Sequence, residues 1–226
     1  MRSTVQELLD SLHAAATEEE RRSWAVASAQ ALGLGGIAVS LGQELVWFSD
    51  DTSARLEDLQ FVLGQGPSQL FKDEPGTREV PDLGKVLAQQ WPQFTAEAEE
   101  LGIAALFVWP VHIGAAQIGT MTGYRRTTGP LSAEQSAQGW LVADALAQQV
   151  LSRWPAGDEC APSSVAGTVG LHRAEVHQAT GVLSEKLGVP LAEALDRLRA
   201  QAYASGRSLS DTAHAIIERE LPHDSA

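Results

Sequence analysis

The stretch AALFVWPVHI, residues 104–113, is followed after three residues by QIGTMTGYRR, residues 117–126. Valine, isoleucine, threonine and aromatic residues, which favour extended strands, are frequent in both runs. The intervening Gly114-Ala115-Ala116 is short enough for a hairpin. We therefore predict that the two runs form the strongest antiparallel strand pair of the chain.

Shorter strands are predicted before this pair. GGIAVSL (35–41) and ELVWFS (44–49) flank a turn at Gly42-Gln43, and TREVPDL (77–83) reads as a short strand and loop. Between and around the strands, the helical spacing of apolar residues and several Ser/Thr capping boxes predict helices. These helices are expected at residues 3–12, 17–32, 55–63, 91–101 and 132–154. Helices at both ends of an antiparallel meander indicate an α+β, sensor-like fold.

A change in composition suggests where the first domain ends. PAGDECAPSSVAG, residues 155–167, is rich in Pro, Gly, Ala and Ser and is predicted to be a linker between a domain at 1–154 and a second one at 168–226. The second domain is expected to be all-α. Its three amphipathic helices are predicted at 168–187, 191–204 and from 208 onward.

The long helix before the linker carries a possible dimer seam. Apolar side chains recur there at spacings of three and four, as in a coiled coil. They are Trp140, Ala143, Ala147, Val150 and Trp154. A small three-helix bundle also gains stability from pairing, so a homodimer is expected. The alternative is that this helix is simply buried within its own domain.

Charge and cysteine content limit the function classes. The net charge is −13 and the sequence pI is about 4.8, which argues against non-specific nucleic-acid binding and against an anionic membrane surface. Cys160 is the only cysteine, so no disulfide forms within the chain; an incidental thiol is expected there, with redox sensing as the alternative. No signal peptide or membrane span is apparent, and a cytoplasmic protein is expected.

The C-terminal segment HRAEVHQATGVLSEKLGVPLAEALDRLRAQAYASGRSLSDTAHAIIERE, residues 172–220, resembles the ANTAR domain, the RNA-binding module of bacterial transcription antiterminators. The resemblance rests on the motifs Gln178-Ala179-Thr180-Gly181, Ala194 to Ala202 and Leu209 to Ala213, in the family's order. Many members have lysine where this chain has Thr180. From Val165 onward the chain has six basic and eight acidic side chains, a net charge of −2, which is unusual for an RNA binder.

The ANTAR resemblance implies a dimer that binds RNA with two small hairpin loops and prevents transcription termination. In such RNA, specificity usually lies in unpaired loop bases. We expect small residues to allow close approach, Arg199 to donate two hydrogen bonds, and Tyr203 to stack a base. The candidate RNA-binding residues are His177, Gln178, Ala179, Thr180, Gly181, Arg199, Ala202 and Tyr203. The alternative for the small residues is close packing between helices, and for the others an ordinary surface or core role.

The N-terminal part resembles a GAF domain of the kind fused to ANTAR domains. This resemblance rests on four segments: LQFVLGQGPSQLF (59–71), EVPDL (79–83), residues 107–126 and GPLS (129–132). It implies a regulatory domain with a pocket for a small-molecule effector, and no cofactor is predicted. Trp47, Phe107, Trp109 and Met121 are the candidate pocket residues, with a core role as the alternative. Haem on His112 is conceivable, but a strand histidine is usually ordinary.

Three other functions compete with a GAF–ANTAR regulator of RNA. The first is a dimeric protein-interaction module without RNA binding, which the acidic composition favours. The second is a helix-turn-helix DNA binder, against which the weak basicity counts. The third is an enzyme, for which we find no catalytic constellation, phosphate loop or metal-ligand spacing in the sequence.

Overall fold

A computed structural model describes residues 17–152 and 173–220, apart from 43, 73–75 and 88. The chain divides into two compact units, residues 1–170 and 171–226. The predicted helix at 3–12, the predicted linker at 155–167 and Cys160 lie outside the described residues. Within the described part, no helix is long and apolar enough to cross a membrane.

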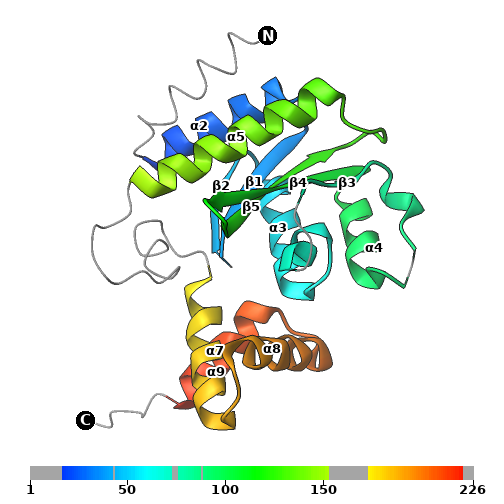
Figure 1. The fold of residues 1–226 in the computed structure, drawn as a ribbon. Helices are drawn as coiled ribbons and strands as arrows, with labels where there is room; N and C mark the ends of the chain where they lie inside the picture. Colours follow the sequence, from blue (N-terminus) through cyan, green and yellow to red (C-terminus); the bar gives the residue numbers. More distant parts are fainter. Residues whose placement is uncertain (1–16, 43, 73–75, 88, 153–172, 221–226) are drawn as a thin grey trace. The chain divides into compact units, whose positions relative to one another are not determined.

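The first unit is built on a five-stranded antiparallel sheet in the order β2-β1-β5-β4-β3 (Figure 1). Its strands are β1 (Gly36–Leu41), β2 (Glu44–Phe48), β3 (Arg78–Val80), β4 (Ala105–Ile113) and β5 (Ala116–Arg125). The predicted central pair is confirmed, with Trp109 opposite Met121, and so is the β1–β2 hairpin. Gly42 and Gly114 turn these two hairpins with φ of 58° and 59°, values that suit glycine.

Two helices, α2 (Glu18–Ala31) and α5 (Ala133–Ser152), lie side by side on one face of the sheet (Figure 1). Both begin at the predicted capping boxes: Thr17 with Glu20, and Ser132 with Gln135. Between the helices and the sheet lies the larger apolar core. It includes Trp24, Leu32, Ile37, Trp47, Phe107, Trp109, Met121, Val142 and Leu146.

On this face the helix α5 comes very close to the sheet at Gly139. A Cβ added to Gly139 would lie 2.3–2.5 Å from indole atoms of Trp109. The indole Nε1 of Trp109 also donates to the backbone oxygen of Ser136, at 3.4 Å. The absence of a side chain at Gly139 is therefore what lets the indole fit beneath the helix.

The dimer seam predicted on α5 is corrected at two of its residues. Ala143 and Ala147 are buried in the core of their own unit, together with Val142 and Leu146. Because α5 packs on the sheet and lies beside α2, its buried face is wider than a coiled-coil seam. Trp140 is exposed and Val150 is half-buried, whereas Trp154 lies outside the described residues.

The opposite face of the sheet is covered by α3 (Asp51–Leu63) and α4 (Pro92–Glu100), with 3-10 turns at Pro67–Lys72 and Leu83–Lys85. A second apolar cluster fills this side, with Leu56, Leu83, Trp91, Phe94, Leu106 and Tyr124. The predicted helix at 55–63 begins earlier, at Asp51. Its N-cap is Asp50, which exchanges capping hydrogen bonds with Ser53.

A buried carboxylate ties α3 to the sheet. The Glu57 side chain, buried on α3, accepts hydrogen bonds from Ser40 Oγ on β1 and Thr122 Oγ1 on β5, both at 3.0 Å. Gln60 Nε2 donates to it as well, at 2.9 Å. Hydrogen bonds to a buried carboxylate offset part of the cost of removing its charge from water.

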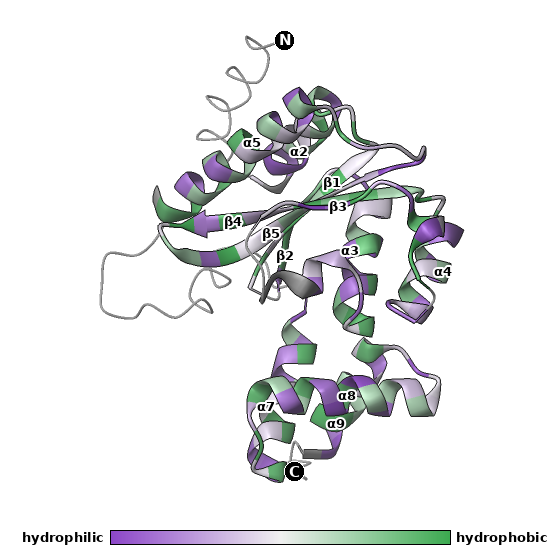
Figure 2. Cartoon of the chain, turned by 45° about the vertical axis from the view of Figure 1, so that its right-hand side comes forward, coloured by the Kyte–Doolittle hydropathy of each residue, from purple (hydrophilic) through white to green (hydrophobic). Residues whose placement is uncertain are grey.

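The second unit consists of three helices, α7 (Ala174–Leu187), α8 (Leu191–Ser205) and α9 (Leu209–Glu220). Gly188 and Gly206 end α7 and α8 with φ of 61° and 62°, the left-handed conformation typical of helix C-caps. Hydrophobic and hydrophilic residues form stripes along all three helices (Figure 2). The apolar stripes meet in a core of Val176, Ala179, Ala194, Leu195, Leu198, Ala202, Leu209 and Ala213.

Candidate nucleic-acid interface

Three of the eight predicted RNA-binding residues lie inside the helical bundle, which corrects that part of the prediction. Ala179 and Ala202 are buried in the core, where small side chains allow helix backbones to approach one another. Thr180 is also buried, and its Oγ1 donates to the backbone oxygen of Val176 at 2.6 Å. A nucleotide outside the bundle does not reach these side chains.

Gly181 differs from its neighbours in the same motif. It lies in the middle of α7, yet a Cβ added there would meet no atom within 4 Å. Glycine in a helix interior costs about 1 kcal/mol relative to alanine. Packing within the domain does not explain this cost, because alanine would fit. The open space beside Gly181 is therefore accessible to a partner that approaches the α7 backbone.

Arg199 lies on α8 with its side chain mostly buried, 16% exposed. Its Nη1 donates to Asp196 Oδ1 at 2.9 Å. Burial lowers the pKa of the Arg199 guanidinium from its ordinary value and the nearby charge of Arg173 lowers it further, while Asp196 acts in the opposite direction. The Arg199 side chain is thus held in place by its burial and by the hydrogen bond to the Asp196 carboxylate.

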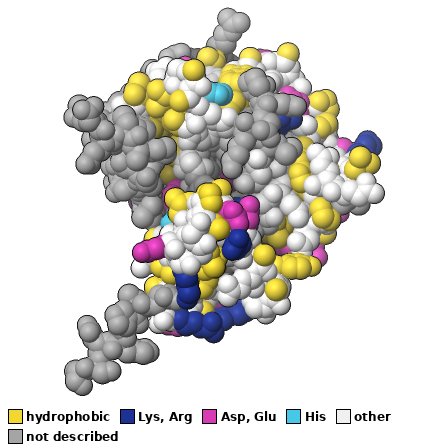
Figure 3. Space-filling model, turned by 60° about the horizontal axis from the view of Figure 1, so that its bottom comes forward, with side chains coloured by type: hydrophobic (Ala, Val, Ile, Leu, Met, Phe, Trp, Pro, Cys, Tyr) yellow, Lys and Arg dark blue, Asp and Glu magenta, His cyan; other side chains and the backbone are white. Residues whose placement is uncertain are grey.

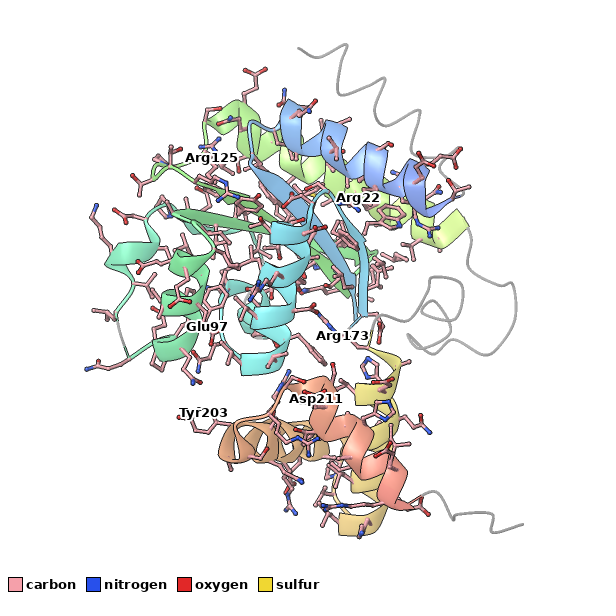
Figure 4. The ribbon with its side chains drawn as sticks, turned by 180° about the vertical axis from the view of Figure 1, so that it is seen from behind. Arg22, Glu97, Arg125, Arg173, Tyr203 and Asp211 are labelled. Atoms are coloured by element: carbon pink, nitrogen blue, oxygen red, sulfur yellow. The ribbon has the colours of Figure 1, made fainter. Side chains whose placement is uncertain are left out.

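Tyr203 follows Arg199 by one helical turn, so both lie on one side of α8. Its side chain is 73% exposed, which excludes the alternative of a core residue. In Figure 4 it extends away from α8. An exposed aromatic ring beside an arginine is the combination on which unpaired bases stack in nucleic-acid-binding proteins.

The start of α7 holds a basic residue that the sequence prediction did not single out, and it is buried. Arg173 is the N-cap residue of α7 and is 6% exposed (Figure 4). One turn later His177 is half-buried, whereas Gln178 is exposed. Arg173 lies one turn before the predicted motif but is as little exposed as Thr180, so it is not placed in the interface. On the face of this unit seen in Figure 3, several Lys and Arg side chains gather beside hydrophobic ones.

The four residues predicted to line an effector pocket in the first unit are core residues instead. Trp47, Phe107, Trp109 and Met121 all belong to the apolar core between the sheet and the pair α2–α5. Trp47 packs edge-on against Trp24, with ring centroids 5.6 Å apart. No metal-binding group of His, Cys, Asp and Glu occurs in the described ranges, and His112 is half-buried near the end of β4.

The structure thus consists of an α+β unit followed by a small helical domain, on which the exposed Tyr203 lies one turn from the largely buried Arg199. Residues 171–217 match the family model of the ANTAR domain, so the chain contains an ANTAR domain. No curated protein matches the chain at a significant level.

Solved structures similar to the chain include GAF domains. One is the GAF domain of a phosphoenolpyruvate-protein phosphotransferase from Coxiella burnetii: 15% identity, 66% of this chain and 94% of that one, TM-score 0.49. Another is the nlh2 GAF domain from A. aeolicus in an inactive state, with 14% identity and a TM-score of 0.49; the similarity covers 67% of this chain and 96% of that one. A third is the type II free methionine-R-sulfoxide reductase from Thermoplasma acidophilum, with 20% identity and a TM-score of 0.41; the similarity covers 60% of this chain and 95% of that one. Similarity at this level says nothing about ligand or activity.

Proposed function

We propose that this protein is a non-catalytic, signal-responsive regulator whose ANTAR domain binds RNA hairpin loops and prevents transcription termination. Gly181 on α7, together with Arg199 and Tyr203 one turn apart on α8, is proposed to contact the RNA; these three residues are here called the Arg–Tyr surface. The observation that carries the proposal is the ANTAR match at residues 171–217.

The shape of the Arg–Tyr surface supports this proposal. Tyr203 offers an exposed ring for a loop base, and the packed stem of Arg199 limits the entropy lost when its guanidinium binds. Gly181 leaves room for a backbone or base close to α7. The mixture of one aromatic, one held cation and one open glycine favours loop bases over a run of phosphates.

A direct test is fluorescence anisotropy with the full chain and an RNA of two short hairpin loops. Arg199→Ala is expected to weaken binding by about 1–3 kcal/mol because it removes a base or phosphate donor. Arg197→Ala is the matched control. Arg197 also pairs with a carboxylate on α8, Glu193 at 2.6 Å, but it lies on a different side of the helix.

The result that contradicts the proposal is a wild-type chain with no affinity for this RNA at low salt. The ANTAR domain would then act as a protein-interaction module. If the Arg199 and Arg197 variants lose RNA affinity equally, the Arg–Tyr surface is not the specific contact, and another face of the protein binds the RNA.

The first unit is proposed to be a GAF-like sensor that also mediates homodimerisation. Its five-stranded antiparallel sheet with helices on both faces supports the first role. On α5, Leu141 and Leu151 are exposed by more than half, and Trp140, next to Leu141 in the sequence, is partly exposed as well. Exposed large apolar side chains on one helix support a partner helix at that face.

A further inference from the structure

We infer that the first unit binds a small amphipathic organic cation in a cavity beside strand β3, separate from the core tryptophans discussed above. The cavity has a volume of about 580 Å³, within the range of ligand pockets in proteins. It lies between the segment 79–91 and the loop that leads from β5 to α5. That the cavity is an effector site rests on the proposed function, whereas the binding of a ligand in it does not.

The walls of this cavity, here called the β3 cavity, are mainly apolar. Val80, Val86 and Trp91 line one part, and Pro130 lines another. Trp91 packs edge-on against Phe94, with ring centroids 5.9 Å apart, so its indole is held in place. Leu87 is 72% exposed although it also lines the cavity. Trp91 is itself only 5% exposed and offers little surface, so the proline rings and the exposed leucine are what a flat apolar body would contact.

The charges around the β3 cavity select the sign of the ligand. Three charged residues line it: Glu79, Asp82 and Lys85. Lys85 Nζ lies 2.7 Å from Asp82 Oδ2, so these two charges neutralise each other. Glu79, exposed on β3, forms no ion pair with any residue in the described ranges. The remaining negative charge, on Glu79, complements a ligand cation.

The position of the cavity connects it to the end of the first unit. Gly129 N donates to Pro81 O at 2.7 Å and thereby joins the two segments that form the walls. Three residues after Gly129, Ser132 begins the capping box of α5. A ligand that contacts both walls restrains this loop, and α5 is the last described helix before the ANTAR domain in the sequence.

Two probes with the same indole ring and opposite charges test the inference: tryptamine and indole-3-acetate. Binding is followed in ¹H–¹⁵N correlation spectra of the full chain without RNA. A probe of about 12 heavy atoms is expected to bind with Kd near 1 mM. Tryptamine should shift the amide signals of cavity-lining residues such as Val80, Val86, Trp91 and Gly129, and indole-3-acetate should bind about tenfold more weakly.

Glu79→Gln is expected to weaken tryptamine binding about tenfold without changing the fold, because Glu79 is exposed. Glu100→Gln, at the exposed end of α4 outside the cavity, is the matched control and should bind as the wild type does. The inference is overturned if tryptamine shifts no signal of the cavity at about ten times the expected Kd, if indole-3-acetate binds equally well, or if Glu79→Gln has no effect. Since no RNA is present, these outcomes are independent of RNA binding.

Discussion

Gly139 and Gly181 both lie inside helices, but their surroundings are opposite. At Gly139 the position of a Cβ is taken by the Trp109 indole, and at Gly181 it is empty. Gly139→Ala is therefore expected to destabilise the first unit by about 1–3 kcal/mol through overpacking. Gly181→Ala should stabilise the ANTAR domain by up to about 1 kcal/mol through helix propensity. Urea unfolding, with probes in each unit, measures both changes.

The same Gly181→Ala variant separates folding from recognition. If the RNA contacts α7 at Gly181, the added methyl group reduces RNA affinity while the domain becomes more stable. The expectation is contradicted by a variant that gains stability and binds the hairpin RNA as tightly as the wild type.

Tyr124 provides a pH-dependent probe of the first unit. Burial raises the pKa of its phenol, and the Asp50 carboxylate, whose Oδ1 accepts from Tyr124 Oη at 3.1 Å, raises it further. The folded state therefore favours the protonated phenol. Its contribution to stability is fully present below about pH 10, the ordinary tyrosine value, and is lost as the pH rises through the folded pKa.

The chain has two tyrosines, so Tyr203→Phe leaves Tyr124 as the only one. In this variant, tyrosinate absorbance should appear above about pH 10. Adding Asp50→Asn should move the titration to lower pH because the neighbouring charge is removed. A midpoint that is unchanged by Asp50→Asn would show that the carboxylate does not act on the phenol.

At the scale of helices and strands, local signals predicted most boundaries. The capping boxes at Thr17 and Ser132 and the glycine turns act through neighbouring residues, so they are visible in the sequence. The start of α3 at Asp51 was missed because its first turn, Asp51-Thr52-Ser53, carries no apolar residue. The side of α5 that faces the sheet was also not predictable, since Ala143 and Val142 are equally apolar and only tertiary packing buries both.

The N-cap of α9 is a further test at this scale. Ser208 Oγ accepts from Asp211 N at 3.0 Å and so caps the first turn of α9. Ser208→Ala should destabilise the ANTAR domain by about 1 kcal/mol, because a backbone N–H loses its acceptor. Hydrogen exchange of the α9 amides should accelerate accordingly, while exchange in β4 and β5 should not change.

The exposed leucines of α5 permit a test of the proposed dimer. Leu141→Glu combined with Leu151→Glu should shift a dimer toward monomer in sedimentation velocity, because charges would be buried at the interface. Leu87→Glu, at a still more exposed leucine away from α5, is the control. A wild-type chain that is monomeric at micromolar concentration would contradict the dimer.

At the scale of the whole molecule, charge limits how RNA can be bound. The chain carries a net charge of −13. Each phosphate contact to a single-stranded RNA contributes a slope of about −0.7 in a plot of log affinity against log salt concentration. Two or three such contacts are expected, so the slope should be no steeper than about −2. A slope near −5 would contradict recognition through loop bases.

Sequence reasoning identified the two-part architecture and the helices of the ANTAR domain, but not the surface that a partner would meet. In the motif 178–181, Ala179, Thr180 and Gly181 are all small, yet Ala179 and Thr180 are interior and Gly181 is open. The β3 cavity has no local signature either, because its walls come from segments about 40 residues apart. Such features arise only from the way the elements pack.

The carboxylate of Glu57 has a consequence for how the strands find their alignment. Sliding β1 along β5 by two residues would keep every side chain on its own face, so the apolar pattern alone barely distinguishes the slipped pairing from the native one. It would, however, change the spacing of Ser40 and Thr122, which lie two positions apart in the register and both donate to Glu57: a slip in one direction moves them further apart, and a slip in the other places them directly opposite each other. A misaligned sheet would thus disturb the hydrogen bonds that this buried carboxylate accepts, and this penalty favours the native alignment.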